Sequence, residues 1–166
     1  VVITGMDTIN PLGDNLEEFY NNLLAGKSGI KKWQTLKVDN LDCRIGGDIA
    51  DYDCRAALEK LKGLLVEDKY KRLRKLFRNM TFSNKTATLT ALKAFSQSGL
   101  LGTDFNPYQI SVMVGGHNFN TKYVAQQYLQ FLEEPAYIDP LYGIEALDPN
   151  IPGTVTEVLG VQGPAY

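Results

Sequence analysis

The sequence has few of the residues from which disulfide frameworks and metal sites are built. It holds two cysteines and one histidine among 166 residues. Cys43 and Cys54 lie on either side of RIGGDIADYD, a spacing that matches neither a disulfide framework nor a Cys-x-x-Cys metal or redox pair. One histidine and two distant cysteines do not make a set of metal ligands. We therefore expect ordinary, partly buried thiols, no bound metal, and a reducing, cytoplasmic compartment.

Charge of one sign and long apolar runs are also lacking. The formal net charge is −2, so no overall positive field would attract the chain to nucleic acid or to anionic lipid. No apolar run approaches the roughly 20 residues of a membrane-spanning helix. The first residues lack the basic start and the small-residue cleavage site of a secretory signal, although a leader ahead of Val1 would not be visible. We expect neither a nucleic-acid nor a membrane partner.

The residues that are present suit one globular α/β domain. The chain is 44% hydrophobic and 22% charged, which is enough for a core. Short β-type runs at 1–4 (VVIT) and 109–116 (QISVMVGG) predict strands, the second buried on both faces. Helical spacing predicts helices within 16–26, 54–65, 68–80, 82–100 and 120–134, and a last helix from near Pro152 to Gly160. Strands that alternate with helices favour an α/β layered fold.

The remaining segments are expected to be loops. Residues 27–52 show no sustained period and predict loops with at most short strands. The proline-containing stretch 139–152 predicts a surface excursion. Neither glycine motif suits a phosphate: TGMDTINPLG carries Asp7 and Pro11 where a dinucleotide loop needs glycine and a backbone donor. AGKSG at 25–29 lacks the earlier glycine of a phosphate-binding loop and follows a helix.

Two features outside the glycine motifs could support function. His117 follows the predicted strand 109–116, but it has no Cys, Ser or acidic neighbour in sequence, so a locally packed loop histidine is the preferred interpretation. The run KYKRLRKLFR at 69–78 is the strongest local charge feature. Helical geometry places Lys71, Arg74, Lys75 and Arg78 on one face. This patch is either a solvated helix face or a site for an acidic partner or a phosphate.

Five segments, taken in order, resemble the N-terminal half of the β-ketoacyl synthases, the condensing enzymes of fatty acid and polyketide synthesis. They are VVITGMDTINPLG, LLAGKSGI, ALKAFSQSGL, VMVGG and LGVQGPAY. The resemblance implies a thiolase-like fold with two similar halves, each a five-stranded mixed sheet with helices, stacked as α-β-α-β-α layers. Residues 1–166 would form most of the first half, incomplete because it ends shortly before the family's nucleophilic cysteine. Half of such a core should leave large apolar faces exposed.

The resemblance also assigns site residues. The family's Cys-His-His site would lie outside this chain, and His117, Cys43 and Cys54 match none of its members, so we predict no catalytic residue here. The family presents a basic helix to the acidic acyl carrier protein, and matching that helix are Arg74, Lys75 and Arg78. Asn118 falls where many members place an apolar residue that gates the acyl pocket, and a polar residue there would disfavour a long saturated chain.

The activity that the resemblance implies is acyl transfer by decarboxylative Claisen condensation of acyl and malonyl thioesters. It would require no cofactor beyond the phosphopantetheine arm of the carrier. The implied partners are the acyl carrier protein, the second half of the fold, and a second subunit in a homodimer or a ketosynthase-like heterodimer. Asp7, Asn10 and Thr81 depart from the family pattern and suggest a divergent member, such as one from a polyketide pathway. A malonyl-carrier decarboxylase and a non-catalytic dimer partner are therefore alternatives.

Overall fold

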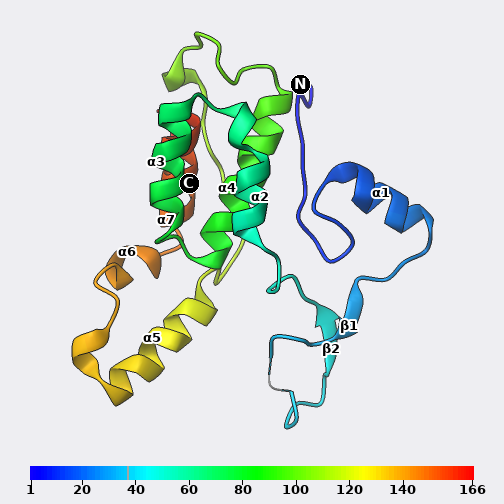
Figure 1. The fold of residues 1–166 in the computed structure, drawn as a ribbon, viewed down its shortest axis with the longest axis vertical. Helices are drawn as coiled ribbons and strands as arrows, with labels where there is room; N and C mark the ends of the chain where they lie inside the picture. The colour runs from blue at the N-terminus through cyan, green and yellow to red at the C-terminus, as the bar shows by residue number, and fades with distance from the viewer. Residues whose placement is uncertain (37) are drawn as a thin grey trace.

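The computed structural model describes residues 1–36 and 38–166 (Figure 1). The helices are α1 (Leu16–Leu24), α2 (Cys54–Lys60), α3 (Glu67–Phe77), α4 (Phe82–Gln97), α5 (Thr121–Glu133), α6 (Tyr142–Glu145) and α7 (Asn150–Leu159). Short 3-10 turns lie at Lys62–Leu64, Pro107–Gln109 and Pro135–Tyr137. Strands β1 (Ile30–Lys32) and β2 (Ile45–Gly47) pair antiparallel, with Ile30 opposite Gly47. Each segment that was predicted to be helical contains a helix.

Helix ends follow the capping residues of the sequence. Asn15 caps α1, because its side chain accepts a hydrogen bond of 2.9 Å from the backbone N–H of Glu18. Thr81 caps α4 in the same way through the N–H of Asn84, at 3.3 Å. Gly160 follows α7 with a φ of 73°, a left-handed conformation that glycine adopts without strain. The predicted end of the last helix is confirmed, and its start lies at Asn150, two residues before Pro152.

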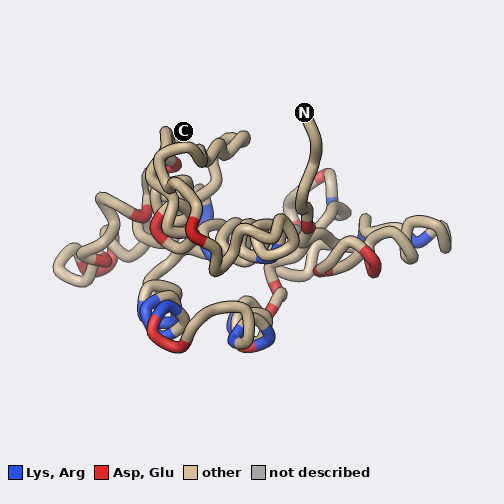
Figure 2. Tube along the Cα trace, turned by 90° about the horizontal axis from the view of Figure 1, so that it is seen from above, with Lys and Arg blue, Asp and Glu red and all other residues tan. Residues whose placement is uncertain are grey.

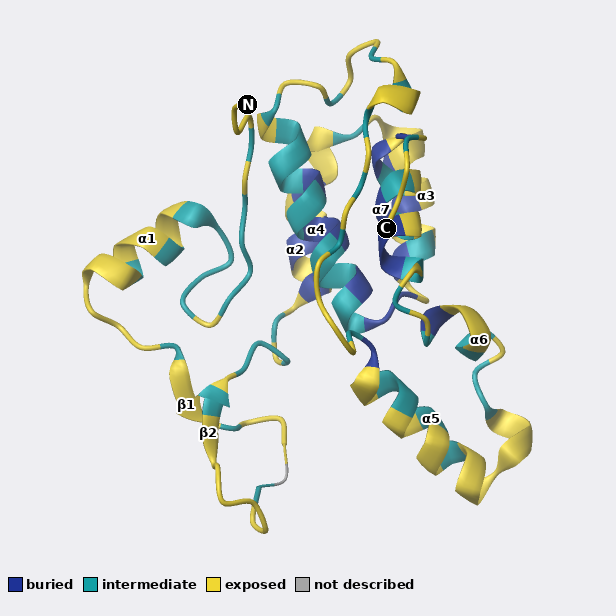
Figure 3. Cartoon of the chain, turned by 180° about the vertical axis from the view of Figure 1, so that it is seen from behind, coloured by how far each residue is buried: buried dark blue, intermediate teal, exposed yellow. Residues whose placement is uncertain are grey.

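The core is a helical cluster in which α4 packs against both α2 and α7. Leu89 and Leu92 of α4 are 0% exposed, and Val155 of α7 is 4% exposed. Leu58 of α2 and Leu73 of α3 complete the cluster from the other side. Figure 3 shows the buried residues concentrated on these four helices, while α1 and α5 lie apart from them.

The strand predictions are only partly confirmed. Residues 1–4 belong to no strand, and the side chains of Val2 and Ile3 are 82% and 80% exposed. Residues 109–116 form a single parallel bridge, between Val112 and Ala165. That bridge is held by backbone hydrogen bonds from Val112 N to Pro164 O and from Tyr166 N to Val112 O, both 3.0 Å. The segment is therefore not buried on both faces. A strand that is buried on both faces needs a neighbouring strand along each edge and a covering layer on each face. Among the described residues, only the segment at Ala165 lies beside 109–116.

Exposed apolar side chains mark the faces that this chain leaves uncovered. They include Tyr20, Leu23 and Leu24 of α1, together with Tyr128, Leu129, Phe131 and Leu132 of α5. Figure 3 shows α5 extended away from the helical cluster with much of its surface exposed. The expectation that large apolar faces would be exposed is thus confirmed.

The stretch 139–152 is not wholly a surface excursion. It contains α6 and the first turn of α7, and Ile151 is 1% exposed. Glu145 at the end of α6 is 7% exposed, and its Oε2 accepts a hydrogen bond of 3.3 Å from the backbone N–H of Thr81. A buried polar group requires such a partner, and the N-terminal end of α4 supplies it. The prediction of a surface excursion was therefore wrong for this part of the stretch, because local composition does not reveal a contact between residues so far apart in sequence.

Candidate functional site: a basic surface on α3

Helix α3 separates its apolar and cationic residues on two faces. Tyr70, Leu73 and Phe77 are buried and recur three and four residues apart, so they form one stripe toward the core. Glu67 and Asp68 lie in the first turn, and Arg74 and Lys75 lie in the last, an order that complements the helix dipole. Figure 2 shows lysine and arginine gathered where α2 and α3 lie, on one side of the molecule.

Ion pairs divide the cations of α3 into two groups. Arg72 binds Glu157 of α7, with 2.7 Å between Nη2 and Oε1, and Lys71 lies 3.7 Å from Glu67 on its own helix. In the part of the chain that the structure describes, no ion pair forms at Arg74, Lys75 or Arg78. The three cations assigned to partner docking are therefore available to an outside anion.

The three unpaired cations and Lys71 surround a common depression. A hollow of about 330 Å³ is lined by Lys71, Arg74, Lys75 and Arg78, all of them exposed. The sequence prediction that these four residues share one face is confirmed by this lining. We name the surface formed by these four residues the basic surface. The exposure of all four side chains leaves them accessible to a partner.

A groove of about 470 Å³ adjoins the basic surface and contains Cys54 in its lining. Burial raises the pKa of the Cys54 thiol, although the charge of Lys85 opposes that rise. A thiol with a raised pKa stays protonated at neutral pH and is a poor nucleophile. Cys43 is exposed, and its thiol contacts the carbonyl oxygen of Ile45 at 3.3 Å. Both cysteines are free thiols, but the prediction that both are partly buried is wrong for Cys43, which is exposed.

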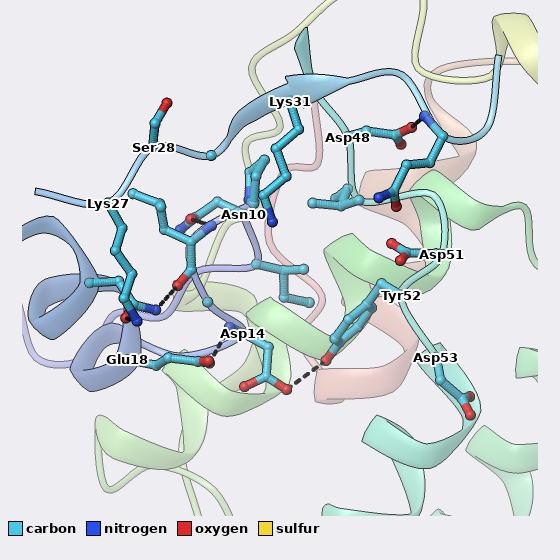
Figure 4. A pocket seen from close by; sticks show the side chains of 18 of the residues that line it. Asn10, Asp14, Glu18, Lys27, Ser28, Lys31, Asp48, Asp51, Tyr52 and Asp53 are labelled. Carbon is cyan, nitrogen blue, oxygen red and sulfur yellow. Dashed lines mark hydrogen bonds between the residues drawn. The ribbon is translucent and has the colours of Figure 1, made fainter. Parts of the chain in front are cut away.

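Another hollow, of about 910 Å³, lies where the N-terminal loop, α1 and the β1–β2 hairpin meet (Figure 4). Its lining carries charges of both signs, with Lys27 and Lys31 alongside Asp48 and Asp51. Figure 4 shows these lysines and carboxylates facing the same space. Such a mixed lining favours neither an anion nor a cation.

Asp14 and Tyr52, which both line this hollow, are joined by a hydrogen bond between their side chains. The Tyr52 hydroxyl donates to Asp14 Oδ2 at 3.3 Å, and Lys60 lies 3.9 Å from the same oxygen. Burial favours the neutral acid, but the Asn15 amide, the charges of Lys93 and Lys60, and Tyr52 together lower the pKa of Asp14. Burial and the Asp14 carboxylate raise the pKa of Tyr52. Both shifts move these groups further from titration at neutral pH, so the pair is unsuited to proton transfer there.

His117 and Asn118 lie together on an exposed loop before α5. Asn118 has a φ of 56°, and its carbonyl oxygen accepts hydrogen bonds from the backbone N–H of Thr121 (3.3 Å) and from its Oγ1 (2.9 Å). A cavity of about 600 Å³ over α4 is lined by Phe119, the next residue, and Asn118 is not part of that lining. The gating role of Asn118 stays a prediction.

Neither a metal centre nor a membrane span is found in the described part of the chain. Residues 1–36 and 38–166 contain no group of three His, Cys, Asp or Glu residues placed to hold a metal ion. No helix within these ranges is both long enough and apolar enough to cross a membrane.

Sequence reasoning missed Lys85, which the structure brings to the basic residues of α3. Its Nζ lies 5.7 Å from the centre of the Phe77 ring, a cation–π contact between α4 and α3. No pattern within α3 could indicate a residue on the next helix. The two side chains belong to successive helices, and only the tertiary structure brings them together.

Curated relatives of this chain are ketosynthases and related proteins. It is 26% identical over its whole length to the polyketide biosynthesis malonyl-ACP decarboxylase PksF of Bacillus subtilis, and it covers 36% of that protein. It is 24% identical to 3-oxoacyl-[acyl-carrier-protein] synthase 2 of Vibrio cholerae, over 99% of this chain and 36% of the relative. The chain thus spans about a third of the length of these relatives.

A solved structure confirms the fold. The ishigamide ketosynthase/chain length factor matches with a TM-score of 0.76 at 18% identity, over 99% of this chain and 38% of that chain. The predicted thiolase-like α/β fold is therefore confirmed for this N-terminal part. The family model described as "Beta-ketoacyl synthase, N-terminal domain" matches residues 1–166. The chain belongs to the β-ketoacyl synthase family.

Proposed function

We propose that the protein is an acyltransferase of the β-ketoacyl-[acyl carrier protein] synthase type, acting in polyketide or fatty acid biosynthesis. The observation that carries this proposal is the match to the family's N-terminal domain along the whole of residues 1–166. A cysteine thiolate outside this range would attack an acyl thioester and release the carrier thiol. Loss of carbon dioxide from a malonyl thioester would then give a carbanion, which attacks the acyl-cysteine and frees the thiolate.

The part of residues 1–166 in this reaction would be to receive the acyl carrier protein. Arg74, Lys75 and Arg78 project from α3 without ion-pair partners in the described chain, so an acidic carrier could neutralise them. Complementary charge of this kind steers encounter and fixes orientation. The carrier would bring the phosphopantetheine arm, so the protein would need no cofactor of its own. The exposed faces of α1 and α5 would be covered by the second half of the fold and by a second subunit. The cytoplasmic location stays a prediction.

Malonyl-carrier decarboxylation is a second candidate, favoured by the similarity to the Bacillus subtilis decarboxylase over the whole of this chain. A non-catalytic dimer partner is a third, favoured by the fold match to a ketosynthase/chain length factor. Both alternatives keep the fold and the basic surface. The residue at the nucleophile position and the state of the acyl pocket would distinguish these alternatives from condensation. Asn118 at the gate of that pocket would disfavour long saturated chains.

The first experiment is the intact mass of the purified protein after incubation with an acyl-carrier thioester. Condensing activity predicts one acyl adduct on a cysteine other than Cys43 or Cys54, and release of that adduct as a longer product when malonyl-carrier is added. Release of carbon dioxide without an adduct would support the decarboxylase. Absence of both would leave the non-catalytic partner.

Charge reversal on the basic surface should weaken carrier binding. We expect Arg74→Glu to raise the Kd for an acyl carrier protein by about tenfold or more, since repulsion replaces attraction at a free cation. Surface plasmon resonance at two salt concentrations would measure this change, and the difference between variant and wild type should shrink at high salt. Lys69→Glu is the matched control, because Lys69 is exposed on the same helix but lines neither hollow. Equal effects of the two substitutions would contradict a localised docking site.

A further inference from the structure

We infer that the groove beside the basic surface is an anchor site that receives an apolar side chain from an acidic, amphipathic helix of the docking carrier protein. This inference rests on the proposed function, since it takes the carrier as the partner. It adds residues of α2 and α4 to a surface that the sequence had confined to α3.

The groove and the basic surface are continuous. The groove, about 470 Å³, is lined by Cys54, Arg55, Leu58, Glu59, Arg74, Phe77, Arg78 and Lys85. Arg74 and Arg78 also line the hollow on the outer side of α3. A partner that pairs with these two arginines is thereby placed at the mouth of the groove.

The floor of the groove is apolar. Leu58 and Phe77 are 2% and 5% exposed, and Cys54 is 7% exposed. They come from α2 and α3, whose packing holds them in place whether or not a partner is present. An apolar side chain that enters from outside would gain contact with a preformed surface, so little ordering would be needed.

The rim of the groove is cationic. Arg55, Arg74, Arg78 and Lys85 face one carboxylate, that of Glu59. Lys85 is held with its Nζ 5.7 Å from the Phe77 ring centre, which places a charge directly above the apolar floor. A small anion alone would leave that floor uncovered, and an apolar ligand alone would leave the cations without partners.

An amphipathic acidic helix satisfies both requirements. Residues three and four apart lie on one helix face, so an apolar residue flanked by carboxylates at these spacings can fill the groove while pairing with its rim. The hollow of about 910 Å³ beside α1 does not offer this combination, because its lining mixes lysines with five carboxylates. The groove is therefore where the observations favour an anchor.

Site-specific photo-crosslinking tests the inference with holo acyl carrier protein as the probe. Benzoylphenylalanine would replace Arg55 on the far rim of the groove, Lys71 on the basic surface, and Lys62, which is exposed and lines neither hollow. We expect the carrier to crosslink from positions 55 and 71 and not from position 62. Crosslinking from 71 alone would overturn the anchor while leaving the proposed docking intact. Crosslinking from neither 55 nor 71 would contradict the docking proposal as well.

A charge-removing substitution gives an independent measurement. Lys85→Met keeps an unbranched apolar chain against Phe77 and removes the charge, so the fold should be retained. We expect the Kd for the carrier to rise about fivefold, because one rim charge is lost. Lys122→Met, on α5, is the control and should leave the Kd unchanged. Wild-type binding by Lys85→Met, together with weakened binding by Arg74→Glu, would overturn the role of the groove alone.

Discussion

Truncation of Leu92 to alanine will lower the free energy of unfolding by about 3 kcal/mol, within the range that buried leucines show. Leu92 lies in α4, the helix that packs against both α2 and α7, and it is 0% exposed. The substitution removes apolar contacts. It also leaves a cavity that the surrounding close-packed side chains do not fill completely. Urea unfolding of the purified protein, followed by circular dichroism, would measure the loss.

Leu41→Ala is the matched control for this prediction. Leu41 is 48% exposed and lies in the loop between β1 and β2, so the same truncation there should cost less than about 1 kcal/mol. If the two variants were equally stable, α4 would not be the central helix of the core. The comparison therefore tests the packing and not merely the hydrophobicity of leucine.

Most of the helices could be predicted from sequence because the periodic spacing of their apolar residues is contained within each one, whereas α6 was not predicted. The stripe of Tyr70, Leu73 and Phe77 has the period of a helix, so α3 is visible without knowledge of its neighbours. The caps are equally local, as Asn15 and Gly160 show. The outward direction of Arg74 and Arg78 followed from the same period, which is why the basic surface was predicted in full.

The sheet could not be predicted from local pattern, because a strand is stabilised by residues far away in the sequence. Val112 bridges Ala165 across 53 residues of chain, and residues 1–4 pair with no strand among the described residues. The β-type composition of residues 1–4 indicates only that this segment could form a strand if another strand lay beside it. The close approach of the two segments also depends on Gly163. A Cβ at that position would overlap the carbonyl oxygen of Ile110, so glycine is required there.

Contacts between helices account for the parts of the site that sequence reasoning missed. Lys85 of α4 lines the groove together with residues of α2 and α3, a grouping that only the tertiary structure produces. Asp7 was noted as a departure from the family pattern, but its partner, Lys93, is 86 residues away. The Nζ of Lys93 lies 3.2 Å from Asp7 Oδ2, and the two side chains are 19% and 3% exposed. An unusual residue can thus be recognised from sequence while its compensating charge cannot.

Replacement of Lys93 by methionine should be among the most destabilising single changes in the chain. The substitution leaves the Asp7 carboxylate buried without its counter-charge, a loss that costs about 3–5 kcal/mol in buried ion pairs. Asp7 Oδ2 has no hydrogen-bond donor among the described residues, so nothing else compensates it. The substitution also removes the hydrogen bond of 2.6 Å from Lys93 Nζ to the carbonyl oxygen of Asp14. Urea unfolding would again supply the measurement.

The double variant Asp7→Asn with Lys93→Met separates the charge from the packing. It removes both members of the pair, so it should recover much of the stability lost in Lys93→Met, since a buried pair replaced as a whole costs far less than one that is broken. Lys60→Met is the exposed control, because its side chain is 73% exposed and 3.9 Å from Asp14, and it should cost less than about 1 kcal/mol. Additive losses in the double variant would mean that Asp7 and Lys93 do not interact, and the cost of Lys93→Met would then belong to its contact with Asp14.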